Sequence, residues 1–240
     1  MDYTLTLFQD AIEKMEPSRQ TTNQKQVARN WTMHYEDFPW VENIIMSLRN
    51  DDGTVSISRG EIYTTENPVE RLVKTLYWGY PKGFPSNHLY LHNILDSADQ
   101  IVNLLPAVGS RLTIERFTNL FDSLKDAVDG MSVSTISKIL TFWKIKAASS
   151  ESVIVDQFVL ECIHLFDDFW GMSTNASSAD AYYSMIKKIN GLARKMSVTP
   201  EQTELFLFRT GKLVKKNRHQ LFNLRLAAYS GFDGMEDDTE

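Results

Sequence analysis

Two charged residues at the margins of apolar segments are the first candidates for chemistry in this sequence. Lys138 lies in the first turn of a predicted helix within SKILTFWKI, and Asp156 closes the apolar run of residues 153–155, 18 residues later. A charge beside a buried run is costly unless it is paired or used. A neutral lysine amine is a nucleophile, and an ionised carboxylate stabilises positive charge that develops in a reaction. The structural alternatives are a lysine that reaches solvent from a surface helix and an aspartate that only caps a helix.

The segment before Lys138 predicts two helices joined by a tight turn. Gly130 suits the left-handed conformation that ends the first helix, and Ser132 or Ser134 suits the N-cap of the second. The second helix has an apolar stripe that consists of Ile136, Ile139, Leu140 and Trp143. Lys138 lies beside this stripe, three or four residues from Ser134, Thr141 and Phe142, so its amine can point along the flank of a partly aromatic cleft. Asp156 would begin the next helix, where the positive end of the helix dipole favours a carboxylate.

This order of elements resembles the lyase-active branch of the helix-hairpin-helix DNA glycosylases, the 8-oxoguanine glycosylase type, and especially its bacterial members. The resemblance is carried by STISK (134–138) and VIVD (153–156), with support from YWGYPKG (77–83) and TPEQTELFLFRTGK (199–212), and it covers about residues 60–212. The turn GMSVS has one glycine, whereas the family's hairpin is usually glycine-rich and holds a phosphate through backbone amides. Serine hydroxyls and the amides at the helix start would have to replace them.

The resemblance implies an enzyme that flips a damaged or modified base out of DNA and cleaves its N-glycosidic bond. Asp156 would stabilise the positive charge at C1′, and Lys138 would form a Schiff base and give an associated lyase activity on the abasic site. Oxidised guanine is the first expected substrate. A hypermodified phage base, such as glucosylated hydroxymethylcytosine, is the alternative and would indicate antiviral defence. Five side chains are candidates for substrate binding: Trp78, Tyr80, Phe142, His164 and Trp170.

The charge distribution favours DNA as the partner although the net charge is −6. Residues 187–225 contain ten basic residues and two acidic ones, and the rest of the chain contains 15 basic and 29 acidic residues. Such asymmetry provides a basic face for a polyanion. The predicted contacts to the DNA backbone are Gly130, Ser132, Ser134, Lys212, Lys215, Lys216 and Arg218. The alternatives are a non-catalytic helical module that binds a nucleic acid or an acidic protein, and a helical protein with a purely structural role.

Helical periodicity dominates the chain and predicts a mainly α fold, a helix-hairpin-helix glycosylase-like bundle. Asn67-Pro68 and Thr199-Pro200 are typical helix starts, and Gly79 and Gly211 are the expected ends of those helices. Further helices are expected near 2–15, 38–49, 86–104, 113–128, 134–146, 151–169, 177–196 and 213–229. We expect a single unit over 1–240, with possible lobes at 86–170 and at 1–85 plus 171–230 that flank a cleft, and an acidic tail at 233–240.

The remaining composition limits the cofactors and the location. Cys162 is the single cysteine, so that an intrachain disulfide, a cysteine-based zinc site and an iron–sulfur cluster are excluded. The five histidines have no spacing typical of metal ligands, and we therefore expect no metal and no cofactor. The sequence has no signal-peptide pattern and no apolar stretch that spans a membrane, which predicts a cytoplasmic protein. We expect a monomer that does not contact membranes.

Overall fold

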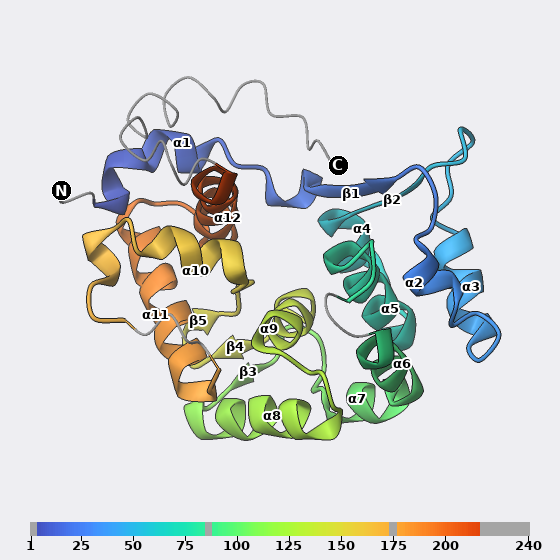
Figure 1. Ribbon diagram of the computed structural model, residues 1–240. Coiled ribbons are helices and arrows are strands. Elements are labelled where there is room, and N and C mark those ends of the chain that lie inside the picture. Colours follow the sequence, from blue (N-terminus) through green and yellow to red (C-terminus); the bar gives the residue numbers. More distant parts are fainter. Residues whose placement is uncertain (1–3, 85–87, 173–176, 217–240) are drawn as a thin grey trace.

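The computed structural model confirms a mainly helical fold (Figure 1) and describes residues 4–84, 88–172 and 177–216. The helices are α1 (Gln9–Glu13), α2 (Arg29–Thr32), α3 (Pro39–Met46), α4 (Arg59–Thr64), α5 (Pro68–Gly79), α6 (His88–Asp96), α7 (Ala98–Leu104), α8 (Ile114–Ala127), α9 (Val133–Phe142), α10 (Gln157–Ile163), α11 (Ala179–Lys195) and α12 (Pro200–Lys216). Within the described ranges, 3-10 helices lie at Leu5–Phe8, Pro17–Arg19 and Asp167–Phe169. None of the helices in these ranges combines the length and the apolar character of a membrane span.

The described part of the chain also contains two small sheets. Strands β1 (Thr21–Gln24) and β2 (Val55–Ser58) pair antiparallel, with Thr21 opposite Ser58 and Gln24 opposite Val55. In the second sheet, β4 (Lys146–Ala147) lies between β3 (Arg111–Leu112), to which it is parallel, and β5 (Ser150–Glu151), to which it is antiparallel. Both sheets are short, so that helix packing supplies the core.

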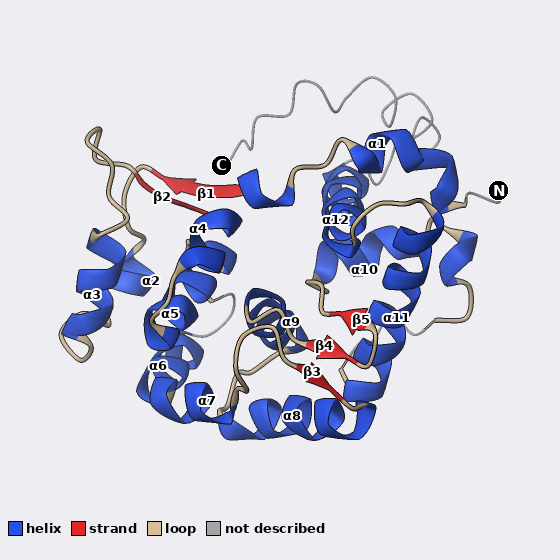
Figure 2. Ribbon diagram, turned by 180° about the vertical axis from the view of Figure 1, so that it is seen from behind, coloured by secondary structure: helices blue, strands red, loops and turns tan. Residues whose placement is uncertain are grey.

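The helices form two groups with α9 between them (Figures 1 and 2). Helix α1 lies with α10, α11 and α12 in one group, and the chain then crosses to β1 and β2 beside the second group, α2 to α7. Helix α9 packs against α4, α5 and α8. The first and the last α-helices of the described residues, α1 and α12, therefore lie together, and the segment between α1 and β1 spans both groups.

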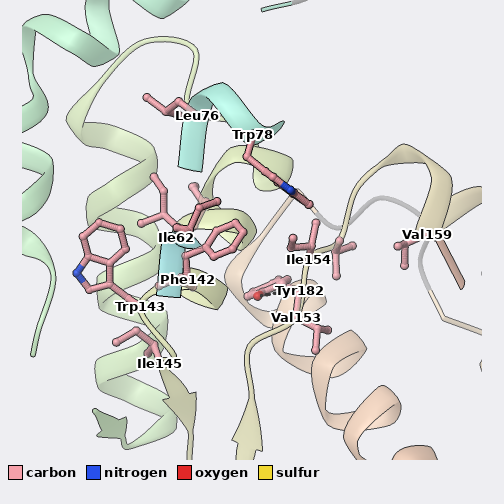
Figure 3. Close-up of a cluster of buried hydrophobic side chains, with 14 of the residues drawn as sticks. Ile62, Leu76, Trp78, Phe142, Trp143, Ile145, Val153, Ile154, Val159 and Tyr182 are labelled. Carbon is pink, nitrogen blue, oxygen red and sulfur yellow. Dashed lines mark hydrogen bonds between the residues drawn. The ribbon is translucent and has the colours of Figure 1, made fainter. Parts of the chain in front are cut away.

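A buried cluster supports α9 and the segment that follows it (Figure 3). Phe142, the last residue of α9, lies near Trp78 from α5, and Trp143, the next residue, lies on the other side of Phe142. Ile154 extends toward Trp78 from the segment before α10. Each of these four side chains is at least 93% buried. Tyr182 of α11 is completely buried and donates a hydrogen bond to the Val153 carbonyl at 3.0 Å. The surroundings of both Lys138 and Asp156 are thus anchored in the core.

The predicted helix starts of α5 and α12 are confirmed. Asn67 Oδ1 accepts a hydrogen bond from the Glu70 backbone N–H at 3.0 Å, and Pro68 occupies the first helical position. At the start of α12, Thr199 Oγ1 accepts from the Gln202 N–H at 3.1 Å, and the Gln202 side chain accepts from the Thr199 N–H at 2.9 Å. These reciprocal bonds satisfy backbone donors that the first helical turn leaves without partners.

The predicted end of a helix at Gly211 is wrong, because α12 continues to Lys216. A Cβ at Gly211 would lie 1.9 Å from the Phe158 carbonyl oxygen, so this glycine permits close packing of α12 on α10. The expected helix over 86–104 is divided into α6 and α7. The expected helix over 151–169 is shorter, because residue 151 belongs to β5, Asp156 caps the start of α10, and α10 ends at Ile163. The expected helix over 213–229 is part of α12 as far as Lys216, and its remainder, like the tail 233–240, lies outside the described residues.

Candidate active site

A cavity of about 230 Å³ lies among β1, α4, α5, α9, α10 and α12, and both Lys138 and Asp156 line it. Its lining combines charged groups with aromatic rings, including Arg59, Glu204, Trp78, Phe158 and Phe208. Segments that are far apart in the sequence contribute to it, from Gln20 to Lys212. A concave site with a few converging polar groups and aromatic walls is the usual form of a small-ligand pocket.

Lys138 lies in the second turn of α9, because the helix begins at Val133, and its side chain is 5% exposed. Its Nζ donates hydrogen bonds to Ser134 Oγ at 2.7 Å and to the Ser134 carbonyl at 3.2 Å, and lies 4.8 Å from the centroid of the Tyr80 ring. Gly79 makes room for the lysine: a Cβ there would lie 2.6 Å from Lys138 Cδ and 2.7 Å from Cε. The amine is therefore held by defined partners beside the cavity.

Asp156 is the N-cap of α10 and is half-buried. Its Oδ1 accepts hydrogen bonds from the backbone N–H of Phe158 at 2.9 Å and of Val159 at 3.1 Å. The structural alternative, a capping aspartate, is thus present, but the same carboxylate also lines the cavity. The cap fixes the carboxylate and places it at the positive end of the helix dipole.

A direct clamp joins the residues that precede Lys138 and Asp156. Ser137 Oγ accepts a hydrogen bond from the Val155 N–H at 3.1 Å and lies 3.5 Å from the Val155 carbonyl oxygen. Both residues are buried. This contact holds α9 against the segment before α10, and it is the local reason why the lysine and the aspartate reach one cavity.

A buried ion pair lies in the cavity wall. Arg59 Nη1 and Nη2 donate to the two carboxylate oxygens of Glu204 at 2.7 and 3.0 Å, and both side chains are at most 1% exposed. The Arg59 guanidinium also stacks 5.0 Å from the centroid of the Trp78 ring. Burial raises the pKa of Glu204, Arg59 opposes this shift, and the nearby Asp156 charge adds to it. The pair therefore places a fixed dipole beside the Asp156 carboxylate.

Two aromatic rings from different helices form an edge-to-face pair in the wall. Phe158 of α10 and Phe208 of α12 have centroids 5.4 Å apart at 88°. Lys215 Nζ lies 5.2 Å from the Phe158 centroid, and Lys212 Nζ lies 4.9 Å from the Phe208 centroid. Apolar faces with ammonium groups on them suit the stacking of a base whose backbone is anionic.

Gln20 contributes a polar group that has no hydrogen-bond partner among the described residues. The residue lines the cavity and is 8% exposed, and its Oε1 is buried without a donor. Its backbone carbonyl is fixed by the Arg59 N–H at 3.0 Å and by Trp78 Nε1 at 3.2 Å. A buried acceptor without a donor is costly unless a ligand supplies the donor.

The residues that were predicted to bind substrate are distributed unevenly. Trp78 lines the cavity, whereas Phe142 is completely buried behind it, with their ring centroids 5.4 Å apart. Tyr80 lies beside the cavity: its hydroxyl contacts Thr135 Oγ1 at 3.0 Å. His164 and the 89% exposed Trp170 line a separate, shallow depression near the 3-10 helix at residues 167–169 and are not brought to Lys138.

Tyr80 is coupled electrostatically to Lys138. Burial raises the pKa of the Tyr80 phenol, but the Lys138 ammonium and the hydroxyls of Ser134, Thr135 and Ser132 outweigh burial, so that the pKa lies below its ordinary value. The Tyr80 hydroxyl lies 3.3 Å from Ser134 Oγ, which accepts from Lys138. A chain of polar groups thus leads from the amine to the phenol.

The predicted DNA-binding residues fall at two places. Gly130 has φ +97° in the turn before α9, Ser132 caps α9 by accepting from the Thr135 N–H at 3.3 Å, and Ser134 binds the Lys138 amine. Lys212 lines the cavity, while Lys215 and Lys216 are exposed near the end of α12. Arg218 lies outside the described residues. Gly130 is not the helix cap that its type suggested, since α8 already ends at Ala127.

Several lining residues were not found from the sequence: Gln20, Thr21, Thr22, Arg59, Gly79, Phe158, Glu204 and Phe208. One signal was available, because Glu204 is an acidic residue within the apolar run ELFLF, and a charge in such a run needs a partner. The partner, Arg59, is 145 residues away.

Comparisons with known proteins identify one family. A family model described as "Putative 8-oxoguanine DNA glycosylase OGG-like protein" matches residues 16–208. No curated protein and no solved structure matches the chain. The match includes Gln20, Lys138, Asp156 and Phe208, and therefore nearly the whole lining of the cavity.

Proposed function

The chain belongs to the OGG-like family of 8-oxoguanine DNA glycosylases, and from this we propose that the cavity receives a flipped, modified base, with Asp156 and Lys138 at its sugar. Family membership supports a DNA glycosylase with DNA as its partner. The observation that carries the finer proposal is that Lys138 and Asp156, from two separate elements, line one cavity with aromatic walls. An enzyme can reach a base inside a duplex only by extruding it into such a pocket.

Asp156 would stabilise the sugar as the N-glycosidic bond breaks. The bonding electron pair leaves with the base, and positive charge develops at C1′ and the ring oxygen. A carboxylate that is already fixed by its helix cap needs no reorganisation to stabilise that charge. The buried Arg59–Glu204 pair beside it keeps the surroundings ordered.

Lys138 would then act as the nucleophile of the lyase step. After the base has left, the neutral amine bonds to the electron-poor C1′ and loses a proton, the bond from C1′ to the ring oxygen breaks, the ring oxygen takes up a proton, and a Schiff base forms. Loss of a proton from C2′ of the Schiff base then breaks the C3′–oxygen bond, so that the 3′ phosphate leaves and the strand is cleaved. Ser134 accepts two hydrogen bonds from the Lys138 amine and leads to the Tyr80 hydroxyl, so this chain of groups can carry the proton that the amine must lose.

Gln20 would select the base. When the side chain turns toward the cavity, its amide oxygen can accept a hydrogen bond from a base N–H, a donor that the described residues do not supply. Sites of this kind discriminate strongly, since a base without the donor leaves the acceptor unpaired. Phe158 and Phe208 would stack on the base, while Lys212 and the exposed Lys215 and Lys216 would bind phosphates.

The experiment measures base release from duplexes that each carry one modified base, 8-oxoguanine first and glucosylated hydroxymethylcytosine second. Release is detected as strand cleavage after alkali, and the Schiff base is trapped with borohydride. We expect Lys138→Gln to abolish trapping, and Asp156→Asn to lower the rate of release by about 10²- to 10³-fold. Lys74→Gln is the matched control, because Lys74 is a largely buried lysine that pairs with Glu70 on α5, outside the cavity.

The outcomes separate the alternatives. Base release without borohydride trapping would show that the protein excises the base without a lyase step, and that Lys138 is not a nucleophile. Salt-sensitive DNA binding without release from any duplex would favour the non-catalytic binding module. Preferred release of the glucosylated base would support antiviral defence, whereas preferred release of 8-oxoguanine would support repair.

A further inference from the structure

A second group of chemically capable side chains lies outside the candidate active site. His34 and Asp37 belong to the turn between α2 and α3, and His92 belongs to α6. One potential ligand atom of each residue lies within 4.8 Å of the others, and His92 Nδ1 is 3.7 Å from Asp37 Oδ2. None of the three lines the cavity that contains Lys138.

The chemistry of this group matches a transition-metal site. Two imidazoles and one carboxylate are common ligands of zinc, with metal–ligand bonds of about 2.0 to 2.2 Å. Neighbouring ligands of a tetrahedral ion are then about 3.3 to 3.5 Å apart. The separation of His92 and Asp37 is already near this value, and the widest separation, within 4.8 Å, would have to shorten by no more than about 1.5 Å. Magnesium and calcium are disfavoured because they prefer oxygen ligands.

The positions of the three side chains suit ligation. His34 is 3% exposed, and its backbone is fixed by a hydrogen bond from the Phe38 N–H to the His34 carbonyl at 2.9 Å. The His34 and His92 ring centroids are 5.5 Å apart, and the Phe38 ring centroid lies 5.0 Å from that of His92. The side chains of Asp37 and His92 are 58% and 37% exposed, so an ion can enter from solvent.

We propose that His34, Asp37 and His92 form a binding site for a divalent transition-metal ion of the zinc type, with water completing the coordination. The ion would join the turn between α2 and α3 to α6 and so stabilise this group of helices. It would take no part in base release, because the site is separate from the cavity. The sequence did not show the site because His92 is 55 residues beyond Asp37.

The test uses full-length, tag-free protein that has been stripped with a chelator and is then titrated with Zn²⁺ in a calorimeter. We expect one equivalent to bind, and the thermal midpoint to rise by about 5 to 10 °C at a Zn²⁺ concentration roughly 100-fold above Kd. Co²⁺ at the same site should give the visible absorption of a tetrahedral ion. Base release at room temperature should be equal in the stripped and the loaded protein.

Matched variants locate the ion. His92→Asn and Asp37→Asn alter the two ligands that solvent reaches and should each weaken Zn²⁺ binding by 10-fold or more, whereas His164→Asn, at an exposed histidine that is the C-cap of α10, should leave it unchanged. The proposal is overturned if the wild-type protein shows no zinc-dependent midpoint. It is equally overturned if both ligand variants bind Zn²⁺ as tightly as the wild type, which would place the ion elsewhere.

Discussion

At the scale of single residues, three polar residues line the cavity from separate segments of the chain: Lys138, Asp156 and Gln20. The first two are held by hydrogen bonds within the protein, whereas the Gln20 oxygen has no donor among the described residues. A polar atom that is buried without a partner destabilises the free protein, and a ligand that supplies a donor would satisfy it. This difference distinguishes Lys138 and Asp156, which are proposed to take part in the reaction, from Gln20, which is proposed to recognise the base.

Gln20→Leu tests recognition. The change removes the acceptor but retains much of the side-chain volume, so we expect kcat/KM for base release to fall by about 10- to 100-fold, the value of one buried hydrogen bond of roughly 1 to 3 kcal/mol. The free energy of unfolding should not fall, because the lost oxygen has no partner among the described residues. Gln24→Leu, a glutamine of β1 outside the cavity, is the control. A destabilised Gln20→Leu protein with normal kcat/KM would assign Gln20 to folding.

Gly79→Ala tests the position of the nucleophile. A methyl group at residue 79 would lie 2.6 Å from Lys138 Cδ, so the lysine side chain must move while the backbone need not. We expect borohydride trapping to fall at least 10-fold with a loss of unfolding free energy of no more than about 2 kcal/mol. Gly191→Ala is the matched control, because a Cβ there meets nothing within 4 Å and should stabilise α11 by roughly 0.5 to 1 kcal/mol. Unchanged trapping in Gly79→Ala would contradict the proposed role of Gly79.

Lys138 and Asp156 could be predicted together as candidates because the features that mark them are local. Each is a charge at the edge of an apolar run, and 18 residues separate them. Gln20 carries no such mark, since a glutamine in the polar stretch SRQTTNQ resembles any loop residue. Only the tertiary structure, which folds Trp78 and Arg59 onto its backbone, brings it into the cavity.

At the scale of elements, the start of α10 is tied to α9 through one side chain. Ser137 Oγ accepts from the Val155 N–H, and both residues directly precede the two candidate catalytic residues. Ser137→Ala leaves that buried N–H without its partner, which should lower the free energy of unfolding by about 1 to 3 kcal/mol. The rate of base release should fall further than this loss of stability alone would explain, because α10 and its N-cap Asp156 are no longer held against α9. Chemical unfolding and single-turnover release measure the two effects. Ser184→Ala, at an exposed position on α11, should change neither. Normal release in a destabilised Ser137→Ala protein would show that the clamp serves stability alone.

Helix starts were more predictable than helix ends in this chain. The capping signals at Asn67 and Thr199 act within four residues, and the structure confirms both. Gly211 has the residue type of a helix end, but its role is set by the carbonyl of Phe158 on another helix. Strand β1 was missed for a similar reason: TTNQ has no apolar alternation, and its pairing with β2 depends on a segment about 30 residues later.

At the scale of the whole molecule, the Arg59–Glu204 pair connects the start of α4 to α12 across the cavity wall. The two residues are 145 positions apart, so the pair joins the two groups of helices that flank α9. A buried ion pair often contributes little net stability, because desolvation of the charges offsets their attraction. The pair at this place is therefore better explained by what it provides to the cavity than by folding alone.

Arg59→Met and Glu204→Met test this explanation when they are compared singly and together. Arg59→Met leaves the Glu204 carboxylate buried without its cation and should cost about 3 to 5 kcal/mol, since a solitary buried charge is poorly solvated. The double variant removes both charges and should regain the wild-type free energy of unfolding to within about 1 kcal/mol. We nevertheless expect the double variant to release base at least 10-fold more slowly, because the dipole beside Asp156 is lost. Denaturant unfolding and single-turnover release measure the two roles separately. A double variant that is stable and fully active would show that the cavity does not need the pair. A double variant as unstable as Arg59→Met would show that the pair holds the two groups of helices together.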